Sequence, residues 1–370
     1  MSYARRSCIS GLFLLLLALA CEANSGFIGV KDSHFELNGS PFLFNGFNSY
    51  WLMHVAAEPT ERYKVTEVLK DASSAGLSGL DFVISEAKKY GVRLILSFVN
   101  QWNDFGGKAQ YVQWARNAGA QINGDDDFYT HPMLKKYFKN HIEKVVTRLN
   151  GITRVAYRDD PTIMAWELMN EPRDQADYSG KTVNVWVQEM ASFVKSLDNK
   201  HLLEVGMEGF YGDSVPERKS FNPGYQVGTD FISNHLINEI DFATIHAYTD
   251  QWVSGQNDDA QLVWMEKWIT SHWQDAKTIL KKPLVLAEFG KSIRSGQGSR
   301  DTFMTSVYNN VYNLAKEGGT MAGSLVWQLM AQGMENYDDG YCIVLAKNPS
   351  TTQIIIGQSH AMTALAHSFN

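Results

Sequence analysis

Cysteine is scarce in this sequence: there are three in 370 residues, and Cys8 and Cys21 lie in or at the edge of an apolar N-terminal block. Cys342 is then the one cysteine certain to belong to a processed chain, so no intramolecular disulfide framework can form. The sequence also lacks a His, Cys and Asp cluster with metal-ligand spacing. We therefore expect stability to come from the core, and we expect neither a metal nor any other cofactor.

Excess positive charge and long hydrophobic runs are also missing. The formal net charge is −7 and no basic stripe stands out, which argues against a nucleic-acid partner. The apolar block 9–20 is too short to cross a bilayer and follows the basic pair Arg5-Arg6. We predict that residues 1–24 are a signal peptide and that residues 25–370 form one secreted, extracellular domain. We expect a monomer with no membrane anchor.

The first informative stretch is a short apolar run that ends in an Asn-Glu pair. Residues 163–168 have strand length, Asn170 and Glu171 follow, and Pro172 then removes a backbone donor. A carboxyl at the tip of a buried strand is partly desolvated, which raises its pKa toward the value that a general acid needs. On this tripeptide alone, a glutamate that caps the next helix is an equally good explanation.

A second apolar run, 284–287, ends in Glu288 and is followed by Gly290. The two glutamates are 288 − 171 = 117 residues apart, so only a fold that gathers distant strand ends can bring them together. A (β/α)₈ barrel does this, because its active site is built from the carboxyl ends of its strands. Two carboxyl groups on either side of a sugar ring are the machinery of glycoside hydrolysis.

Strands and helices alternate along the chain, which predicts an α/β fold of the (β/α)₈ TIM-barrel type. A barrel needs eight strands, yet the stretch 77–80 runs almost directly into a helix where the second strand should be. We therefore expect the second strand to be absent from this chain. The strands are predicted at 42–47, 91–100, 163–168, 202–206, 242–245, 284–288 and 323–326, after a hairpin around Asn38-Gly39, and the helices at 61–75, 81–90, 131–150, 183–196, 260–280 and 302–317.

Four strand ends carry recognisable motifs: Trp166–Arg173, Ile245–Tyr248, Leu286–Gly290 and Leu325–Gln328. These motifs resemble the strand-end signatures of glycoside hydrolase family five. Two further runs, 98–107 and 157–161, resemble the plant endo-β-1,4-mannanases of that family, over essentially the whole chain after the leader. The resemblance implies a secreted retaining enzyme whose substrate partner is a mannan-type wall polysaccharide.

The resemblance also implies a role for each strand-end residue. Glu171 matches the acid/base and Glu288 the nucleophile, while Asn170 would bind the 2-hydroxyl of the reacting sugar. His246 and Tyr248 would steer the nucleophile and the departing sugar. The aromatic residues Trp327 and Trp102 would hold sugars, the first at the cleavage subsite and the second further along the groove. Taken singly, a strand-end His or Trp is more often structural.

The chain departs from the family pattern at Ser78-Gly79. Family members carry there a second strand that ends in an Arg-Thr-Trp-type run, whose Arg pairs with the nucleophile, and neither that Arg nor that Trp has a counterpart here. Two alternatives therefore stay open beside a mannanase that cuts mannan, galactomannan and glucomannan. One is a related β-1,4-glucanase, and the other is a wall-polysaccharide-binding variant with impaired catalysis.

Overall fold

The computed structural model describes residues 26–58, 60–71, 79–103, 107–334 and 337–369. The described chain begins with an antiparallel sheet of β1 (Ile28–Lys31), β2 (His34–Leu37) and β3 (Ser40–Pro41). Asn38 and Gly39 connect β2 to β3 with φ of 53° and 83°, which is the left-handed geometry of a tight hairpin. The predicted hairpin turn is confirmed. Buried Phe35 of β2 meets Phe242 edge-on at 5.2 Å, so this sheet covers the end of the barrel opposite the site.

Seven parallel strands follow, and each overlaps a strand predicted from the sequence. The last five are largely buried on the barrel side and on the helix side, which is why their sequences read as continuous apolar runs, whereas the first two are only half-buried. The strands are β4 (Phe44–Phe47), β5 (Leu94–Ser97), β6 (Ile163–Glu167), β7 (Leu202–Glu204), β8 (Ala243–Ala247), β9 (Leu284–Phe289) and β10 (Met321–Val326).

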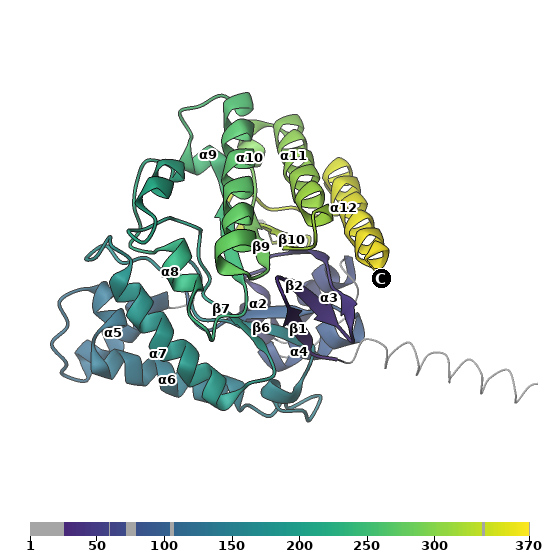
Figure 1. The fold of residues 1–370 in the computed structure, drawn as a ribbon. Helices are drawn as coiled ribbons and strands as arrows, with labels where there is room; N and C mark the ends of the chain where they lie inside the picture. Colours follow the sequence, from purple (N-terminus) through teal and green to yellow (C-terminus); the bar gives the residue numbers. More distant parts are fainter. Residues whose placement is uncertain (1–25, 59, 72–78, 104–106, 335–336, 370) are drawn as a thin grey trace, which may run out of the picture.

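The longer helices surround the strands, as Figure 1 shows. Their bounds are α2 (Leu52–Ala57), α3 (Arg62–Asp71), α4 (Gly79–Lys89), α5 (Gly107–Asn117), α6 (Pro132–Val146), α7 (Lys181–Leu197), α8 (Phe231–His235), α9 (Thr249–Trp252), α10 (Asp258–Asp275), α11 (Gln297–Lys316) and α12 (Pro349–Ser368). The sequence did not predict α5 or α12. The last residues of the helix predicted at 61–75 lie outside the described residues. Helix α12 begins at a proline and packs Met362 and Leu365 into the core.

The strands form two parallel sheets, β4-β10-β9-β8 and β5-β6-β7, which follow one another in the order of a (β/α)₈ barrel. Backbone bonds bridge the seam between β7 and β8: Asp241 N donates to Leu203 O at 2.8 Å, and His246 N donates to Glu208 O at 2.9 Å. In the described part of the chain, no ladder or backbone hydrogen bond joins β4 to β5. The wall is therefore open where the second strand is expected.

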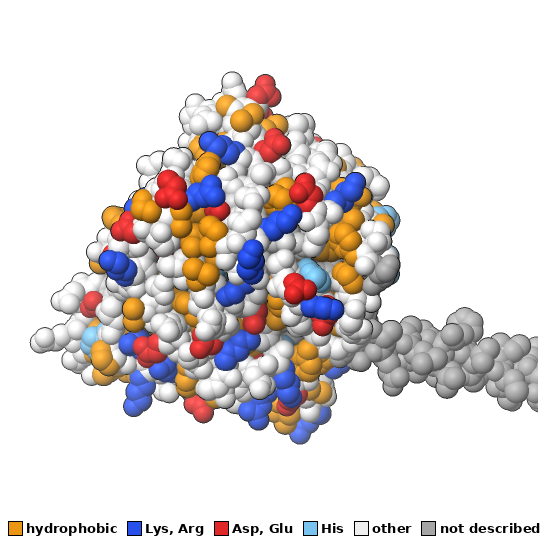
Figure 2. Space-filling view, in the orientation of Figure 1, with side chains coloured by type: hydrophobic (Ala, Val, Ile, Leu, Met, Phe, Trp, Pro, Cys, Tyr) orange, Lys and Arg blue, Asp and Glu red, His pale blue; other side chains and the backbone are white. Residues whose placement is uncertain are grey.

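The outer surface does not collect charge of one sign on the face drawn in Figure 2, where basic and acidic side chains are interspersed. Over the ranges that the structure describes, no helix is long and apolar enough to cross a membrane. The predicted signal peptide, residues 1–24, lies outside those ranges.

Candidate active site

A cavity of about 2060 Å³ runs from the carboxyl ends of the barrel strands along the whole length of β4 and β5. Strands whose tips converge on one face of a barrel bring distant residues together, as the sequence predicts. All seven predicted site residues line this cavity: Trp102, Asn170, Glu171, His246, Tyr248, Glu288 and Trp327.

Glu171 lies just past the end of β6, where the backbone turns inward. Its φ is 51°, in the left-handed region that a residue with a Cβ adopts only at a cost of about 1–3 kcal/mol. Its amide donates to Gly206 O at 2.8 Å, which fixes this turn to the strand-end loop after β7. Glu171 is 8% exposed, and its carboxyl accepts from His246 Nδ1 at 2.8 Å and from Trp102 Nε1 at 2.7 Å. The backbone thus directs the carboxyl into the cavity.

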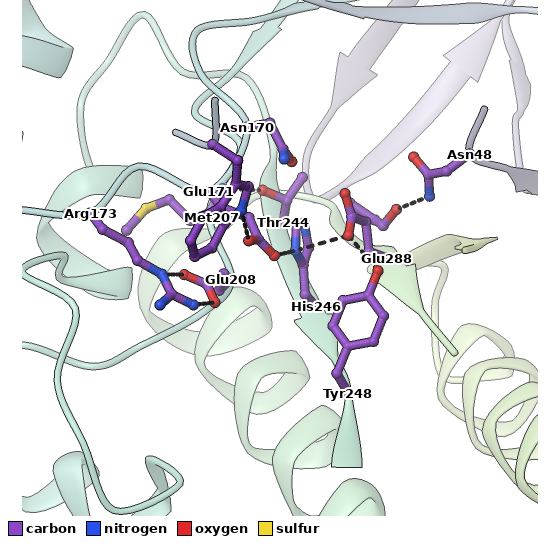
Figure 3. Close-up of polar contacts among 12 residues, drawn as sticks. Asn48, Asn170, Glu171, Arg173, Met207, Glu208, Thr244, His246, Tyr248 and Glu288 are labelled. Carbon is purple, nitrogen blue, oxygen red and sulfur yellow. Dashed lines mark hydrogen bonds and ion pairs between the residues drawn. The ribbon is translucent and has the colours of Figure 1, made fainter. Parts of the chain in front are cut away.

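Glu288 faces Glu171 from β9. It is the register partner of His246 on β8, and the residue is 7% exposed. Tyr248 donates its hydroxyl to Glu288 Oε2 at 2.6 Å, and His246 Nδ1 lies 3.6 Å from the same oxygen. Figure 3 shows the imidazole between the two carboxyls. One oxygen of each glutamate lies within 4.8 Å of the other.

Burial in the structure was expected to raise the pKa of Glu171 toward that of a general acid. The pKa shifts of Glu171, Glu288 and His246 do not follow this expectation. Burial raises the pKa of Glu171, but the hydrogen bond and charge of His246, the Trp102 bond and the Arg173 charge outweigh it and lower the pKa below its usual 4.5. Burial raises the pKa of Glu288 to about 8, although His246 opposes this. Burial lowers the pKa of His246, but the charges of both glutamates raise it to about 9. Near neutral pH these shifts favour an anionic Glu171 and a cationic His246 beside a protonated Glu288.

The two tryptophans differ in how they are held. Trp327 stacks on Tyr50 at 5.6 Å with ring planes 10° apart, and its Nε1 donates to Asp339 Oδ2 at 2.7 Å. Trp102 is 42% exposed, but its ring lies 4.9 Å from the Arg173 guanidinium and its N–H binds Glu171. In this structure Trp102 therefore contacts the Glu171 carboxyl itself.

Asn170 donates its Nδ2 to Asn100 Oδ1 at 3.1 Å and lines the cavity between β5 and β6. An additional ion pair, which sequence reasoning did not single out, lies beside it. Arg173 holds Glu208 through two bonds of 2.9 and 2.6 Å. Burial and the charge of Glu171 raise the pKa of Glu208 to about 7, against the pull of Arg173. The signal was present in the sequence, because both residues follow strand ends.

Sequence reasoning also missed a pair of carboxyls deeper in the barrel. Glu167 on β6 and Glu204 on β7 are register partners, and both line the cavity. Each is the ionisable residue of an otherwise apolar strand, and this pattern in the sequence could have identified them. Alternation within a strand shows which face a residue takes, but it does not give the register between two strands.

Glu171, His246 and Glu288 offer atoms close enough together to hold a metal ion. The donor set does not favour one, since Trp102, Tyr248 and His246 already direct N–H and O–H groups at these carboxyl oxygens. An exposed group of Asp338, Asp339 and Cys342 offers a second such set. The absence of a metal remains a prediction.

Several known proteins resemble this chain. A family model described as GH family 5 beta-mannosidase-like matches residues 72–337. The chain is 84% identical over 398 aligned positions to mannan endo-1,4-beta-mannosidase 1 of Solanum lycopersicum, with 100% of both chains covered. It is 47% identical to mannan endo-1,4-beta-mannosidase 1 of Oryza sativa subsp. japonica, with 95% of this chain and 89% of that protein covered. Among solved structures, the endo-beta-1,4-mannanase from Thermotoga petrophila matches with a TM-score of 0.74 and 31% identity, covering 88% of this chain and 78% of that chain.

The alignment with the tomato protein is longer than this chain. All 370 residues are used, so at least 398 − 370 = 28 aligned positions have no residue here. That number is enough for a strand and the connections on either side of it. A missing segment of that length agrees with the open seam between β4 and β5.

Proposed function

This chain belongs to glycoside hydrolase family 5, in its mannosidase-like branch, and from that premise we propose that it is a secreted endo-β-1,4-mannanase. Its substrates would be the internal bonds of mannan, galactomannan and glucomannan in the extracellular wall. The observation that carries the proposal is the pair Glu171 and Glu288, whose buried carboxyls approach within 4.8 Å in an open cavity. The name of the 84% identical tomato protein supports the choice of mannan.

The short approach of the two carboxyls supports a retaining double displacement. Retaining enzymes hold these groups about 5–5.5 Å apart, whereas inverting enzymes need about 6.5–9.5 Å to admit a water. In the first step the Glu288 carboxylate attacks the anomeric carbon, and Glu171 gives its proton to the departing sugar oxygen. In the second step Glu171 takes a proton from water, which attacks the glycosyl–Glu288 ester and releases Glu288 as a carboxylate.

The protons must be redistributed before the first step. The reaction needs a neutral Glu171 and an anionic Glu288, which is the reverse of the arrangement favoured at pH 7. Both arrangements hold the same number of protons. His246 Nδ1 contacts Glu171 at 2.8 Å and Glu288 at 3.6 Å, so we assign to it the transfer between them.

The other cavity residues would bind sugar. Asn170 would bind the 2-hydroxyl, and Trp327, held flat against Tyr50, would form the platform at the cleavage subsite. Tyr248 would orient Glu288 through its 2.6 Å bond. Because Trp102 contacts Glu171, we place its sugar contact next to the departing group.

The experiment that tests this function compares the reducing ends released from glucomannan, galactomannan and cellulose by purified protein. Release from both mannans and none from cellulose is expected. Cleavage of cellulose alone would replace the proposal with the β-1,4-glucanase alternative. Inversion of configuration in the first-formed product would remove the retaining assignment.

A second candidate function rests on the open seam between β4 and β5. A barrel with an unpaired wall can keep a sugar groove and lose turnover, which would make the protein a wall-polysaccharide-binding variant. Binding to mannan without any released product would favour this candidate.

A further inference from the structure

The barrel wall has two unpaired strand edges that face the same seam. β4 pairs with β10 and β5 pairs with β6, and within the described residues neither strand pairs with anything on its other side. Seven strands are present in barrel order, and a (β/α)₈ barrel has eight, so the place between β4 and β5 is that of a single strand. A strand in that place would lie about 4.8 Å from each neighbour.

The edge of β5 directs the backbone groups of Ile95 and Ser97 into the seam. Leu94 and Phe98 donate their amides, each over 2.9 Å, to backbone oxygens on the β6 side. Successive residues of a strand direct their N–H and C=O groups to alternate edges, so those of Ile95 and Ser97 point to the open edge. No backbone partner for these groups is found in the described chain.

The edge of β4 presents a matching row. Asn48 follows β4, and its amide donates to Val326 O of β10 at 2.9 Å. By the same alternation, the N–H and C=O groups of Asn45 and Phe47 point away from β10 and into the seam. They too have no backbone partner among the residues that the structure describes. These two residues, like the two on β5, line the cavity, so the seam offers backbone donors and acceptors on both sides to one extended chain.

The side chains around the seam are largely apolar and incompletely covered. All of β4 and the apolar residues of β5 are only half-buried, whereas every residue of β8 and β9 is buried. Helix α4 spans the seam on the helix side. Its Val83 packs in the hydrophobic cluster that Phe47 contacts, and its Leu80 packs against the cluster that Leu96 contacts. Apolar side chains on an inserted strand would therefore be covered by this helix.

The comparison with the tomato protein indicates what fits there. At least 28 of its aligned positions have no residue in this chain, which is enough for a strand and its connections, while the remaining strands keep their places. We propose that the seam binds one extended peptide segment of another polypeptide, inserted parallel to β4 and β5. Its backbone pairs with both edges, and its apolar, β-branched side chains face α4. The main-chain bonds give affinity and the alternate side chains give specificity.

The probe is a fluorescently labelled synthetic peptide with the sequence that the tomato protein carries between its equivalents of β4 and β5 and that has no counterpart here. Its fluorescence anisotropy is titrated with the purified natural chain, and Tm is measured with and without the unlabelled peptide. We expect saturable binding and a Tm that rises by about 2–5 °C at saturation. A scrambled peptide of the same composition should do neither.

A second pair of reagents tests recognition through the backbone. A peptide N-methylated at alternate residues keeps its side chains but loses its donors along one edge, so it should bind about ten-fold more weakly. Ser97→Pro removes an N–H that points into the seam, at an edge position where proline is tolerated, and should weaken binding by a similar factor. The matched control is Ser97→Ala, which also loses the side-chain bond to Val99 O but keeps the N–H, and it should bind normally.

If the Ser97→Pro protein folds poorly, the N-methylated peptide with the natural protein decides. No saturable binding, equal binding of the scrambled or N-methylated peptide, or undiminished binding to a folded Ser97→Pro protein would overturn the proposal. A second copy of this chain is the competing occupant. Sedimentation without peptide should show a monomer, and a dimer that the peptide cannot dissociate would assign the seam to the second copy instead.

Discussion

Glu171 and Glu288 play different parts in the proposed reaction, and replacing each should give a different kinetic result. Glu171→Ala removes the general acid, so turnover of mannan should fall by about 10²–10⁴-fold. The first step on an aryl mannoside with a good leaving group should be spared, because that group departs without a proton. Glu288→Ala should abolish both reactions. Steady-state rates on the two substrates measure this.

The matched control for these variants is Glu189→Ala, which removes a carboxyl outside the cavity. It should keep both activities. Equal losses on both substrates for Glu171→Ala would contradict its assignment as the acid.

The pH dependence of kcat/KM follows from where the protons lie. The form with two protons among Glu171, His246 and Glu288 is favoured above the lowered pKa of Glu171 and below the pKa of about 8 of Glu288. The active arrangement holds the same two protons, so its share is constant across that window. We expect a plateau whose acid limb lies at a lower pH than the ordinary pKa of a glutamate, because the pKa of Glu171 is lowered, and whose alkaline limb begins above about pH 8. A rate that instead rises through pH 8 would show that Glu288 must lose its proton to solvent.

At the scale of residues, the sequence identified the groups that carry motifs. Glu171 and Glu288 each end an apolar run, and the structure places both at one cavity. The low pKa of Glu171 was not predictable, because it depends on Trp102 and His246, which come from other strand ends. The Glu167–Glu204 contact depends on register between strands, which no single-strand pattern contains.

At the scale of elements, the open seam between β4 and β5 is the main departure from a closed barrel. Edge donors and acceptors without a partner cost stability and invite wrong pairing. A version of the protein with the missing strand restored from its tomato relative should have a higher Tm and several-fold higher mannanase activity. Thermal unfolding and reducing-end assays on the two proteins measure this.

Equal Tm and equal turnover for those two proteins would mean that the gap is harmless. A scrambled insert of the same length is the control, and it should restore neither property.

The strands could be predicted because buried parallel strands read as apolar runs bounded by polar turns. Helices α5 and α12 were missed for a different reason. Helix α5 lies in a long polar excursion after Trp102, and α12 buries few side chains, chiefly Met362 and Leu365, so its pattern is weak. Their positions are determined by tertiary packing more than by local periodicity.

At the scale of the whole molecule, the proposed reaction requires no metal, since two carboxyls and an imidazole supply every proton transfer. Turnover should therefore be unchanged after dialysis against a chelator such as EDTA. A loss of activity that a divalent cation reverses would instead assign a metal to the group Glu171, His246 and Glu288.

We propose that this chain turns over mannan at the Glu171–Glu288 pair despite its open barrel wall. The most direct measurement determines mannan binding and the release of soluble oligosaccharides on the same purified sample, with the Glu171→Ala, Glu288→Ala double variant beside it. We expect that both proteins bind mannan and that only the natural chain releases oligosaccharides. Binding by both proteins with no product from either would contradict it.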